Sequence, residues 1–329
     1  MTPLKATAIA HPNIAFIKYW GDVDPSQHLP ANGSISMNLD ALSTMTTVAF
    51  VDDLPDDQVI LNGTPPDVVT RQRVGAHLDH LREWAGTDHR AQVFSRNSFP
   101  AGTGLASSAS AFAALTLAAA AALDLALPKS HLSAMARLGS GSASRSIPAG
   151  FVEWAAGESH ETSCAFSIAP PDHWTLCDCI AVTCTTHKVV GSTEGKARAT
   201  TSPIYRARVE SARAALDPCR AAIHARDLAA LGALMETDAV LMHAVTMTSH
   251  PPVYYWMPTT LAVLQSALAW RAEGLPVYFT LDAGPNVHCL CEETNAAPVA
   301  ERLRAIPGVK TVIVARPGPG AHLTDHHLF

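Results

Sequence analysis

Residues 98–112 read SFPAGTGLASSASAF, and this stretch decides how the first half of the chain folds. Small residues from Gly102 to Ala106 lead directly into Ser107 and Ser108, which begin a long alanine-rich segment. Such a turn directs backbone N–H groups and a helix dipole toward one point, which suits a phosphate. It is neither a Walker loop, since no Gly-Lys-Ser/Thr follows, nor a dinucleotide fingerprint. The expected ligand is a nucleoside triphosphate, and plain helix capping is the alternative.

Helices and strands alternate around this turn. The segment GLASSASAFAALTLAAAAALDLAL, residues 104–127, is apolar on nearly every side and is predicted to be a buried helix. Alternating patterns predict half-buried strands at 44–53 and 91–98. Residues 70–86 have helical spacing and end in glycine.

The second half predicts an antiparallel sheet with helices on one face. Two or three helices are expected between residues 195 and 273, and strands are expected at 173–184, 276–283, 286–293 and 310–316, with a helix at 295–306. The expected fold class is therefore mixed α/β, of the α+β kind. We place a domain boundary near residue 180, giving domains 1–180 and 181–329.

Composition narrows the class of function. The 329 residues are 48% hydrophobic and 16% charged, with a net charge of −6 and scattered basic residues. A nucleic-acid footprint or an attachment to acidic lipid is not expected, so the expected partners are small molecules. The N-terminus lacks the regions of a signal peptide, and no apolar run reaches the ~18 residues of a membrane helix, so we expect the cytoplasm. The sequence leaves homodimerisation open.

The seven cysteines predict no cofactor site. Two pairs have C-x-C spacing inside apolar runs, WTLCDCIAVTC and VHCLCEE, which places both thiols of a pair on one face of a strand. Buried reduced thiols are expected rather than a zinc site or a disulfide.

Residues 138–154, LGSGSASRSIPAGFVEW, surround Arg145 with small residues. A guanidinium donates in a planar, two-pronged geometry that matches a carboxylate or a phosphate. Ser140 and Ser142 add hydroxyl donors beside it. The alternative is an ordinary surface ion pair from a flexible loop.

Two further stretches place charged residues at the end of a predicted strand and at the start of a predicted helix. In FTLDAGPNVHCL, residues 279–290, Asp282 ends an apolar strand, which either holds a carboxylate rigidly in a cleft or serves simple turn chemistry. In VVGSTEGKARATTS, residues 189–202, Ser192, Lys196 and Arg198 lie at the start of a predicted helix, where a solvated basic face is the alternative.

Residues 13–24, NIAFIKYWGDVD, contain both residues that suit a bound anion and residues that repel one. Lys18 and the neighbouring aromatic residues Tyr19 and Trp20 suit an anion, yet Asp22 and Asp24 repel one.

Together these stretches resemble the mevalonate diphosphate decarboxylases of the GHMP small-molecule kinase superfamily. The motifs occur in family order from about residue 10 to 320: NIAFIKYWG, LPANGSISMNL, LNGTPPDV, SFPAGTGLASSASAFAAL, RLGSGSASRSIPAGFVEW, GSTEGKARATTS and LDAGPN. The resemblance implies a first domain like ribosomal protein S5 domain 2, a ferredoxin-like second domain, and an active site between them. It also implies ATP and Mg²⁺ as cofactors and phosphorylation of a tertiary C3 hydroxyl, followed by loss of phosphate and carbon dioxide.

The resemblance also implies roles for particular residues. Asp282 would orient or deprotonate the C3 hydroxyl, Arg145 would bind the departing carboxylate, and Lys18 would balance charge near the transferred phosphoryl group. The implied substrate-binding residues are Asn13, Tyr19, Trp20, Arg73, Ser140, Ser142, Ser192 and Lys196. The implied ATP-binding residues are Ser95, Asn97, Gly102, Gly104, Leu105, Ala106, Ser107 and Ser108. No protein ligand to Mg²⁺ is identified.

Departures from the family pattern bear on the substrate. Relatives acting on the diphosphate usually read Lys-Tyr-Trp-Gly-Lys-Arg, whereas this chain has Asp22 and Val23 at the last two positions. Lys196 replaces a methionine, and Arg73 fits a phosphate-binding arginine after a one-residue shift. We therefore expect decarboxylation of mevalonate 5-phosphate to isopentenyl phosphate. The alternatives are the diphosphate reaction and a mevalonate-type kinase that stops before decarboxylation.

Overall fold

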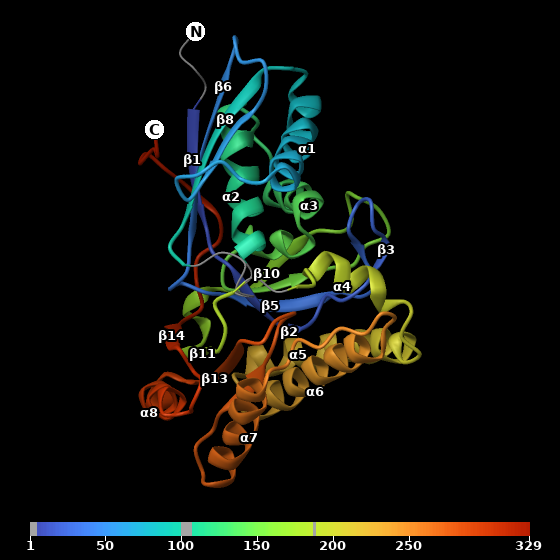
Figure 1. Ribbon diagram of the computed structural model, residues 1–329, viewed down its shortest axis with the longest axis vertical. Coiled ribbons are helices and arrows are strands. Elements are labelled where there is room, and N and C mark those ends of the chain that lie inside the picture. Colours follow the sequence, from blue (N-terminus) through green and yellow to red (C-terminus); the bar gives the residue numbers. More distant parts are fainter. Residues whose placement is uncertain (1–4, 100–106, 187–188) are drawn as a thin grey trace.

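The computed structural model describes residues 5–99, 107–186 and 189–329. The first half builds two sheets, drawn in the upper and middle parts of Figure 1. The larger sheet has the order β15-β1-β6-β8-β7, with only β7 and β8 parallel. Its strands are β1 (Lys5–Ala10), β6 (Thr44–Val51), β7 (Gln58–Leu61), β8 (Arg90–Asn97) and β15 (His322–Thr324).

The second sheet and a short hairpin lie toward the middle of the molecule. The sheet has the order β10-β9-β5-β2, formed by β2 (Asn13–Ile17), β5 (Ser34–Asn38), β9 (Phe151–Trp154) and β10 (Ala165–Ala169). The hairpin pairs β3 (Asp22–Asp24) with β4 (Leu29–Pro30). It directly follows β2, so the chain carries Lys18 to Trp20 between the sheet and the hairpin.

The alanine-rich helix α2 (Ser107–Ala122) packs on β1 and β6, and its small side chains allow that close approach. It is buried as expected, but it ends five residues before residue 127. Asp124 adopts a left-handed backbone with φ of 54°, and the N–H groups of Asp124 and Leu125 bond back to Ala121 and Ala120. This is a Schellman cap, which stops the helix. Helices α1 (Val68–Ala85) and α3 (Lys129–Gly139) flank α2, and the 3₁₀ segment η1 (Gly141–Ser146) follows α3.

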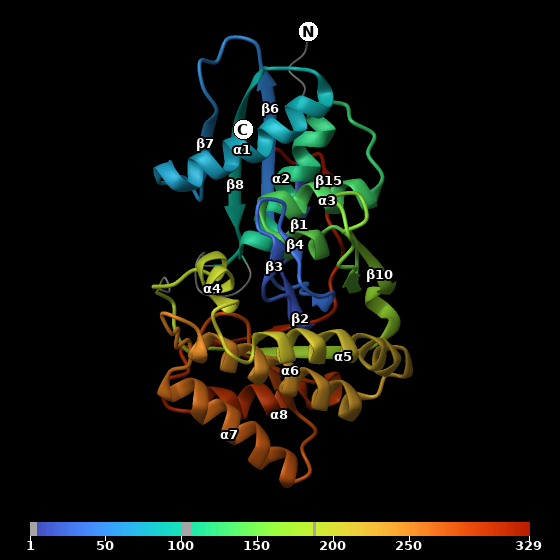
Figure 2. The ribbon, with the colours of Figure 1, turned by 90° about the vertical axis from the view of Figure 1, so that its right-hand side faces the viewer.

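The second half forms one antiparallel sheet, in the order β12-β13-β11-β14, with helices around it (Figure 2). Its strands are β11 (Leu176–Val182), β12 (Tyr278–Thr280), β13 (Val287–Glu292) and β14 (Thr311–Ala315). Its helices are α4 (Ser192–Ala199), α5 (Tyr205–Ala225), α6 (Leu228–Thr248), α7 (Pro258–Ala272) and α8 (Glu293–Arg304), and a 3₁₀ turn, η2 (Pro171–His173), precedes β11. One face packs on α7 and α8, and the other shares a core with α5, α6 and the sheet of β2. Helices therefore cover both faces of this sheet, not one as expected.

We expected a domain boundary near residue 180. That position lies inside β11, whose pairing with β13 begins at Leu176 and whose pairing with β14 begins at Asp178. Strand β15 then returns to pair with β1. The last residues of the chain therefore complete the sheet of the first half.

Helix α6 and the cysteines are both explained by burial. By length and composition α6 could cross a membrane, but half of its apolar window is buried against neighbours that include α5 and β2. All seven cysteines are free thiols. Cys177 faces Cys291 and Cys179 faces Cys289 across β11 and β13, inside the core shared with α7 and α8.

Candidate active site

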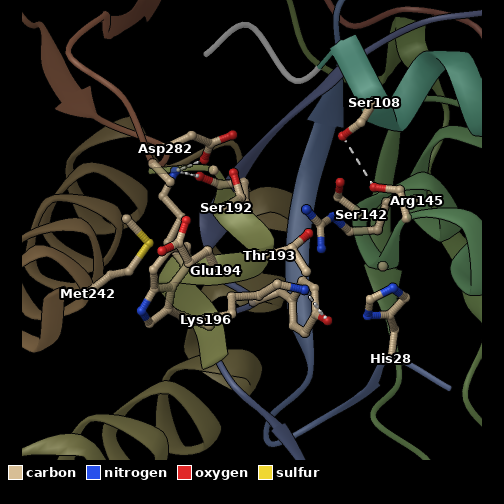
Figure 3. A pocket seen from close by; sticks show the side chains of 18 of the residues that line it. His28, Ser108, Ser142, Arg145, Ser192, Thr193, Glu194, Lys196, Met242 and Asp282 are labelled. Atoms are coloured by element: carbon tan, nitrogen blue, oxygen red, sulfur yellow. Dashed lines mark hydrogen bonds and ion pairs between the residues drawn. The ribbon is translucent and has the colours of Figure 1, made fainter. Parts of the chain in front are cut away.

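A cavity of about 420 Å³ lies between the two halves, where the end of β2 meets α4, α6 and the segment after β12. It brings together residues from five of the stretches singled out in the sequence (Figure 3). Of the predicted catalytic and substrate-binding residues, those that line it are Lys18, Tyr19, Trp20, Arg73, Ser140, Ser142, Arg145, Ser192, Lys196 and Asp282. Asn13 does not line it and instead holds Arg145.

Lys18 and Asp282 form an ion pair at one end of the cavity. Lys18 Nζ lies 2.8 Å from Asp282 Oδ1 and donates to the carbonyl of Ala15 at 2.6 Å. The lysine side chain is 2% exposed and the aspartate 29%, so the carboxylate is the member that substrate can reach. Burial lowers the pKa of Lys18, and the Asp282 charge acts against that. Burial would raise the pKa of Asp282, but attraction to Lys18 and His288 outweighs it and the pKa lies below its usual value.

The backbone of Lys18 is held by three side chains to which the sequence analysis gave no role, two of them from the second half. Its N–H donates to Asp238 of α6 at 2.7 Å, and its carbonyl accepts from Arg208 of α5 at 2.7 Å and from Asn32 at 3.0 Å. Arg208 also pairs with Asp238 at 3.2 Å, and both are almost fully buried. The available signal was a single aspartate inside the apolar run of α6, because a buried charge requires a partner.

Arg145 lies in the wall of the cavity and is fixed from behind. Its Nε donates to Asn13 Oδ1 at 3.1 Å and one terminal nitrogen donates to Ser34 Oγ at 2.6 Å. Asn13 is fixed in turn by the carbonyl of Ser142 and by Ser146 Oγ. Burial lowers the pKa of Arg145 to about 10, partly opposed by Asp282, so the guanidinium is charged at neutral pH.

A cluster of polar groups lies at the other end of the cavity. Lys196 Nζ donates to Tyr19 Oη at 2.6 Å and lies 3.7 Å from Asp22 Oδ2, while Tyr19 donates to Asp22 Oδ1. The Asp22 side chain is only 11% exposed. Burial lowers the pKa of Lys196 to about 8, with Asp22 opposing. Figure 3 shows Asp282 and His28 at opposite sides, with Lys196 between them.

Trp20 supplies an apolar wall near the Asp282 end. It packs with Met242 and Ala283, both of which line the cavity. Gly195 of α4 lies against its ring, where a Cβ would approach Trp20 to 3.0 Å. A glycine at this position therefore lets α4 close over the tryptophan.

A second cavity of about 420 Å³ lies in the first half, beside the N-terminal end of α2. Ser95, Asn97, Ser107 and Ser108 line it, as do Asn62, Thr64, Pro66 and Asp67 between β7 and α1. Gly102, Gly104, Leu105 and Ala106 lie outside the described residues. The two cavities share Arg73, Ser107 and Ser108, so a ligand in one can reach a ligand in the other at the start of α2.

The described residues contain no group of three or more His, Cys, Asp or Glu side chains placed to hold a metal ion. The paired hydroxyls and the helix N-terminus at the junction of the cavities instead suit the phosphates of a nucleotide. A divalent ion would then be held mainly by phosphate oxygens, which is a usual arrangement for Mg²⁺.

Comparison with protein families gives matches along most of the chain. Residues 10–165 match the diphosphomevalonate decarboxylase-like N-terminal domain, and residues 179–316 match the mevalonate 5-diphosphate decarboxylase C-terminal domain.

Two proteins that are similar to this chain over most of their length are named for different substrates. The phosphomevalonate decarboxylase of Haloferax volcanii is 34% identical, over 98% of each chain. The diphosphomevalonate decarboxylase mvd1 of Aspergillus fumigatus is 36% identical, over 94% of this chain and 82% of its own length.

Solved structures match the whole fold. MDDEF in complex with MVAPP, AMPPCP and magnesium has a TM-score of 0.92 at 38% identity, covering 98% of this chain and 99% of its own. The mevalonate diphosphate decarboxylase from Staphylococcus aureus has a TM-score of 0.92 at 37% identity, covering 98% of each chain.

Proposed function

The chain belongs to the diphosphomevalonate decarboxylase family, and from that premise we propose that it acts on mevalonate 5-phosphate and releases isopentenyl phosphate. The family assignment makes it an ATP-dependent carboxy-lyase of the mevalonate pathway with the two-domain GHMP kinase-like fold, using ATP and Mg²⁺. The choice between the monophosphate and the diphosphate is the part that we infer from the site.

The proposed reaction uses both ends of the main cavity and has two steps. Asp282 accepts or orients the C3 hydroxyl proton while that oxygen takes the γ-phosphoryl group of ATP, giving ADP. The C3–O bond then breaks and phosphate leaves with its electron pair. The C1–C2 bond breaks as well, and its electrons form the alkene as carbon dioxide departs.

Three groups carry these steps. Lys18 lies against Asp282 and offsets charge close to the transferred phosphoryl group. Arg145, fixed by Asn13 and Ser34, presents a rigid guanidinium to the carboxylate until it is expelled. Ser107 and Ser108, at the junction of the cavities, would hold the ATP phosphates. When bound, Mg²⁺ neutralises charge on those phosphates.

The observation that carries the monophosphate proposal is the position of Asp22. It does not extend into solvent but is buried against Tyr19 and Lys196, the residues opposite the reacting end. Its charge thereby compensates Lys196, just as Asp282 compensates Lys18. Arg73 and Arg145 are left as the uncompensated cations among the described lining residues, since Glu194 pairs with Arg198.

Charge then favours the shorter substrate. A phosphate monoester carries about −1.5 to −2 at neutral pH and the carboxylate one more, which two free cations nearly balance. A second phosphate adds charge at the end where Asp22 lies. At about 4 Å and an effective dielectric near 20, that repulsion is on the order of a few kcal/mol.

The test compares kcat/KM for mevalonate 5-phosphate and mevalonate 5-diphosphate, measuring ADP and carbon dioxide together. We expect the monophosphate to be preferred, with equal amounts of both products. A higher kcat/KM with the diphosphate would contradict the proposed substrate. Release of ADP without carbon dioxide would show that the protein is a kinase and not a decarboxylase.

Substitution of Asp22 tests the charge argument directly. Asp22→Lys should move the ratio of the two kcat/KM values toward the diphosphate by at least about tenfold, which corresponds to 1.4 kcal/mol. Val23→Lys is the matched control, because Val23 is the adjacent residue and is 66% exposed, whereas the Asp22 side chain is 11% exposed. An equal shift in both variants would show that general charge, not the position of Asp22, sets the preference.

A further inference from the structure

We propose that His28 is a specificity-determining residue that binds the 5-phosphate of the substrate through Nε2. The inference rests on the proposed function, because it deepens the assignment of the far end of the cavity to a single phosphate. His28 lies in the β3–β4 hairpin and lines the cavity opposite Asp282 (Figure 3).

The hairpin holds His28 in a defined position. His28 has a left-handed backbone with φ of 51°, a conformation that non-glycine residues adopt at a cost and that is found disproportionately at functional sites. The backbone is fixed on both sides, since Arg137 of α3 donates to the carbonyl of Gln27 and Arg213 of α5 donates to that of Ala31. The imidazole is therefore presented from a rigid support.

The imidazole ring of His28 uses only part of its hydrogen-bonding capacity among the described residues. Its Nδ1 is buried and lacks a hydrogen bond among the described residues, although Asp22 Oδ2 lies 3.9 Å away. The side chain is 17% exposed. Because Nδ1 faces Asp22, Nε2 on the far side of the ring is the nitrogen left for the cavity. A proton on Nε2 would let the ring donate to an anion in the cavity.

The charged groups already present at this end of the cavity show why a further donor is needed. The other cation at this end, Lys196, is already compensated by Asp22 and hydrogen-bonded to Tyr19. A phosphate placed there needs a further hydrogen-bond donor. His28 can supply one, because it lines this end of the cavity from the hairpin.

Two variants separate a binding role from a structural one. His28→Asn tolerates the left-handed backbone but is too short to place a donor at the Nε2 position. His28→Gln can place its amide N–H near that position. His80→Asn is the control, since His80 is an exposed histidine on α1.

The measurements are KM and kcat for mevalonate 5-phosphate at saturating ATP, the KM for ATP, and the Kd of mevalonate 5-phosphate by calorimetry without ATP. We expect His28→Asn to raise KM and Kd for mevalonate 5-phosphate about tenfold to a hundredfold, the loss for a hydrogen bond to a charged group. The kcat and the KM for ATP should be unchanged, and His28→Gln should recover most of the affinity. His80→Asn should match the wild type.

The outcomes also distinguish this inference from the proposed function. Unchanged KM and Kd in His28→Asn, or a fall in kcat alone, would overturn the role of His28 while leaving the substrate preference intact. If the wild type prefers the diphosphate but His28→Asn still weakens phosphate binding, the proposed substrate fails and the phosphate contact stands. Loss of affinity for ATP as well would indicate a structural role and overturn the inference.

Discussion

At the scale of single residues, the ion pair of Lys18 and Asp282 places one negative charge beside the position proposed for the C3 hydroxyl. Asp282→Asn keeps the shape of the side chain and removes that charge, which is needed most in the transition state. We expect kcat to fall by several orders of magnitude, on the order of 10³-fold, with little change in the KM for mevalonate 5-phosphate. Steady-state release of carbon dioxide measures this, and a nearly normal kcat would remove Asp282 from the mechanism.

Lys196 gives the reaction a pH dependence on the alkaline side. Burial lowers its pKa to about 8, so the free enzyme loses this ammonium as pH rises through that value. Well below pH 8 the charge is fully present, and binding of the 5-phosphate is strongest there. We expect kcat/KM to decline above about pH 8 while kcat declines less, because bound substrate keeps the lysine protonated.

The control for this pH dependence is Lys196→Met, which is similar in length and does not titrate. Its kcat/KM should be lower throughout and should lack the decline near pH 8. If the same decline persists in Lys196→Met, another group causes it.

At the scale of elements, α5 and α6 hold the end of β2 through the buried pair of Arg208 and Asp238. Asp238→Ala would leave Arg208 buried without its partner and the Lys18 N–H without an acceptor, at a cost of about 3–5 kcal/mol. We expect a lower free energy of unfolding in urea and a reduced kcat, because Lys18 loses its support.

Thr237→Ala is the matched control, because Thr237 is the residue next to Asp238 in α6. Thr237 is exposed and bonds only within its own helix, so its loss should change stability by less than about 0.5 kcal/mol. Comparable losses in both variants would mean that the helix itself, not the contact with Lys18, is sensitive at this point.

The elements also show what the sequence could and could not predict. Periodicity was enough for α2 and for the strands of the second half, because their apolar faces extend over many residues. The early end of α2 depends on one residue, Asp124, adopting a left-handed backbone, and periodicity does not report that. The motifs brought Lys18, Arg145 and Asp282 together, but Asp238 and Arg208, which hold the backbone of Lys18, lie far away in sequence.

At the scale of the whole molecule, the two cavities meet at the start of α2. The nucleotide-sized cavity belongs entirely to the first half, whereas the main cavity needs residues from both halves. Phosphoryl transfer between two ligands requires such a junction, since donor and acceptor oxygens must lie in line. Arg73, Ser107 and Ser108 are the residues common to both cavities.

Substitution of Arg73 tests this arrangement, because Arg73 is the one cation among the three residues common to both cavities. It is held by the carbonyl of Gly139 at 3.1 Å and by the ring of Phe112, and no acidic partner among the described residues compensates it. A guanidinium so placed can bind both the γ-phosphate of ATP and the phosphorylated substrate. Arg73→Ala should therefore lower kcat/KM for ATP and for mevalonate 5-phosphate together, each by about tenfold to a hundredfold. Arg71→Ala, exposed on the same helix and lining neither cavity, should leave both values near the wild type. If Arg73→Ala weakens only one of the two substrates, the cavities bind their ligands independently, and the transfer must occur away from the start of α2.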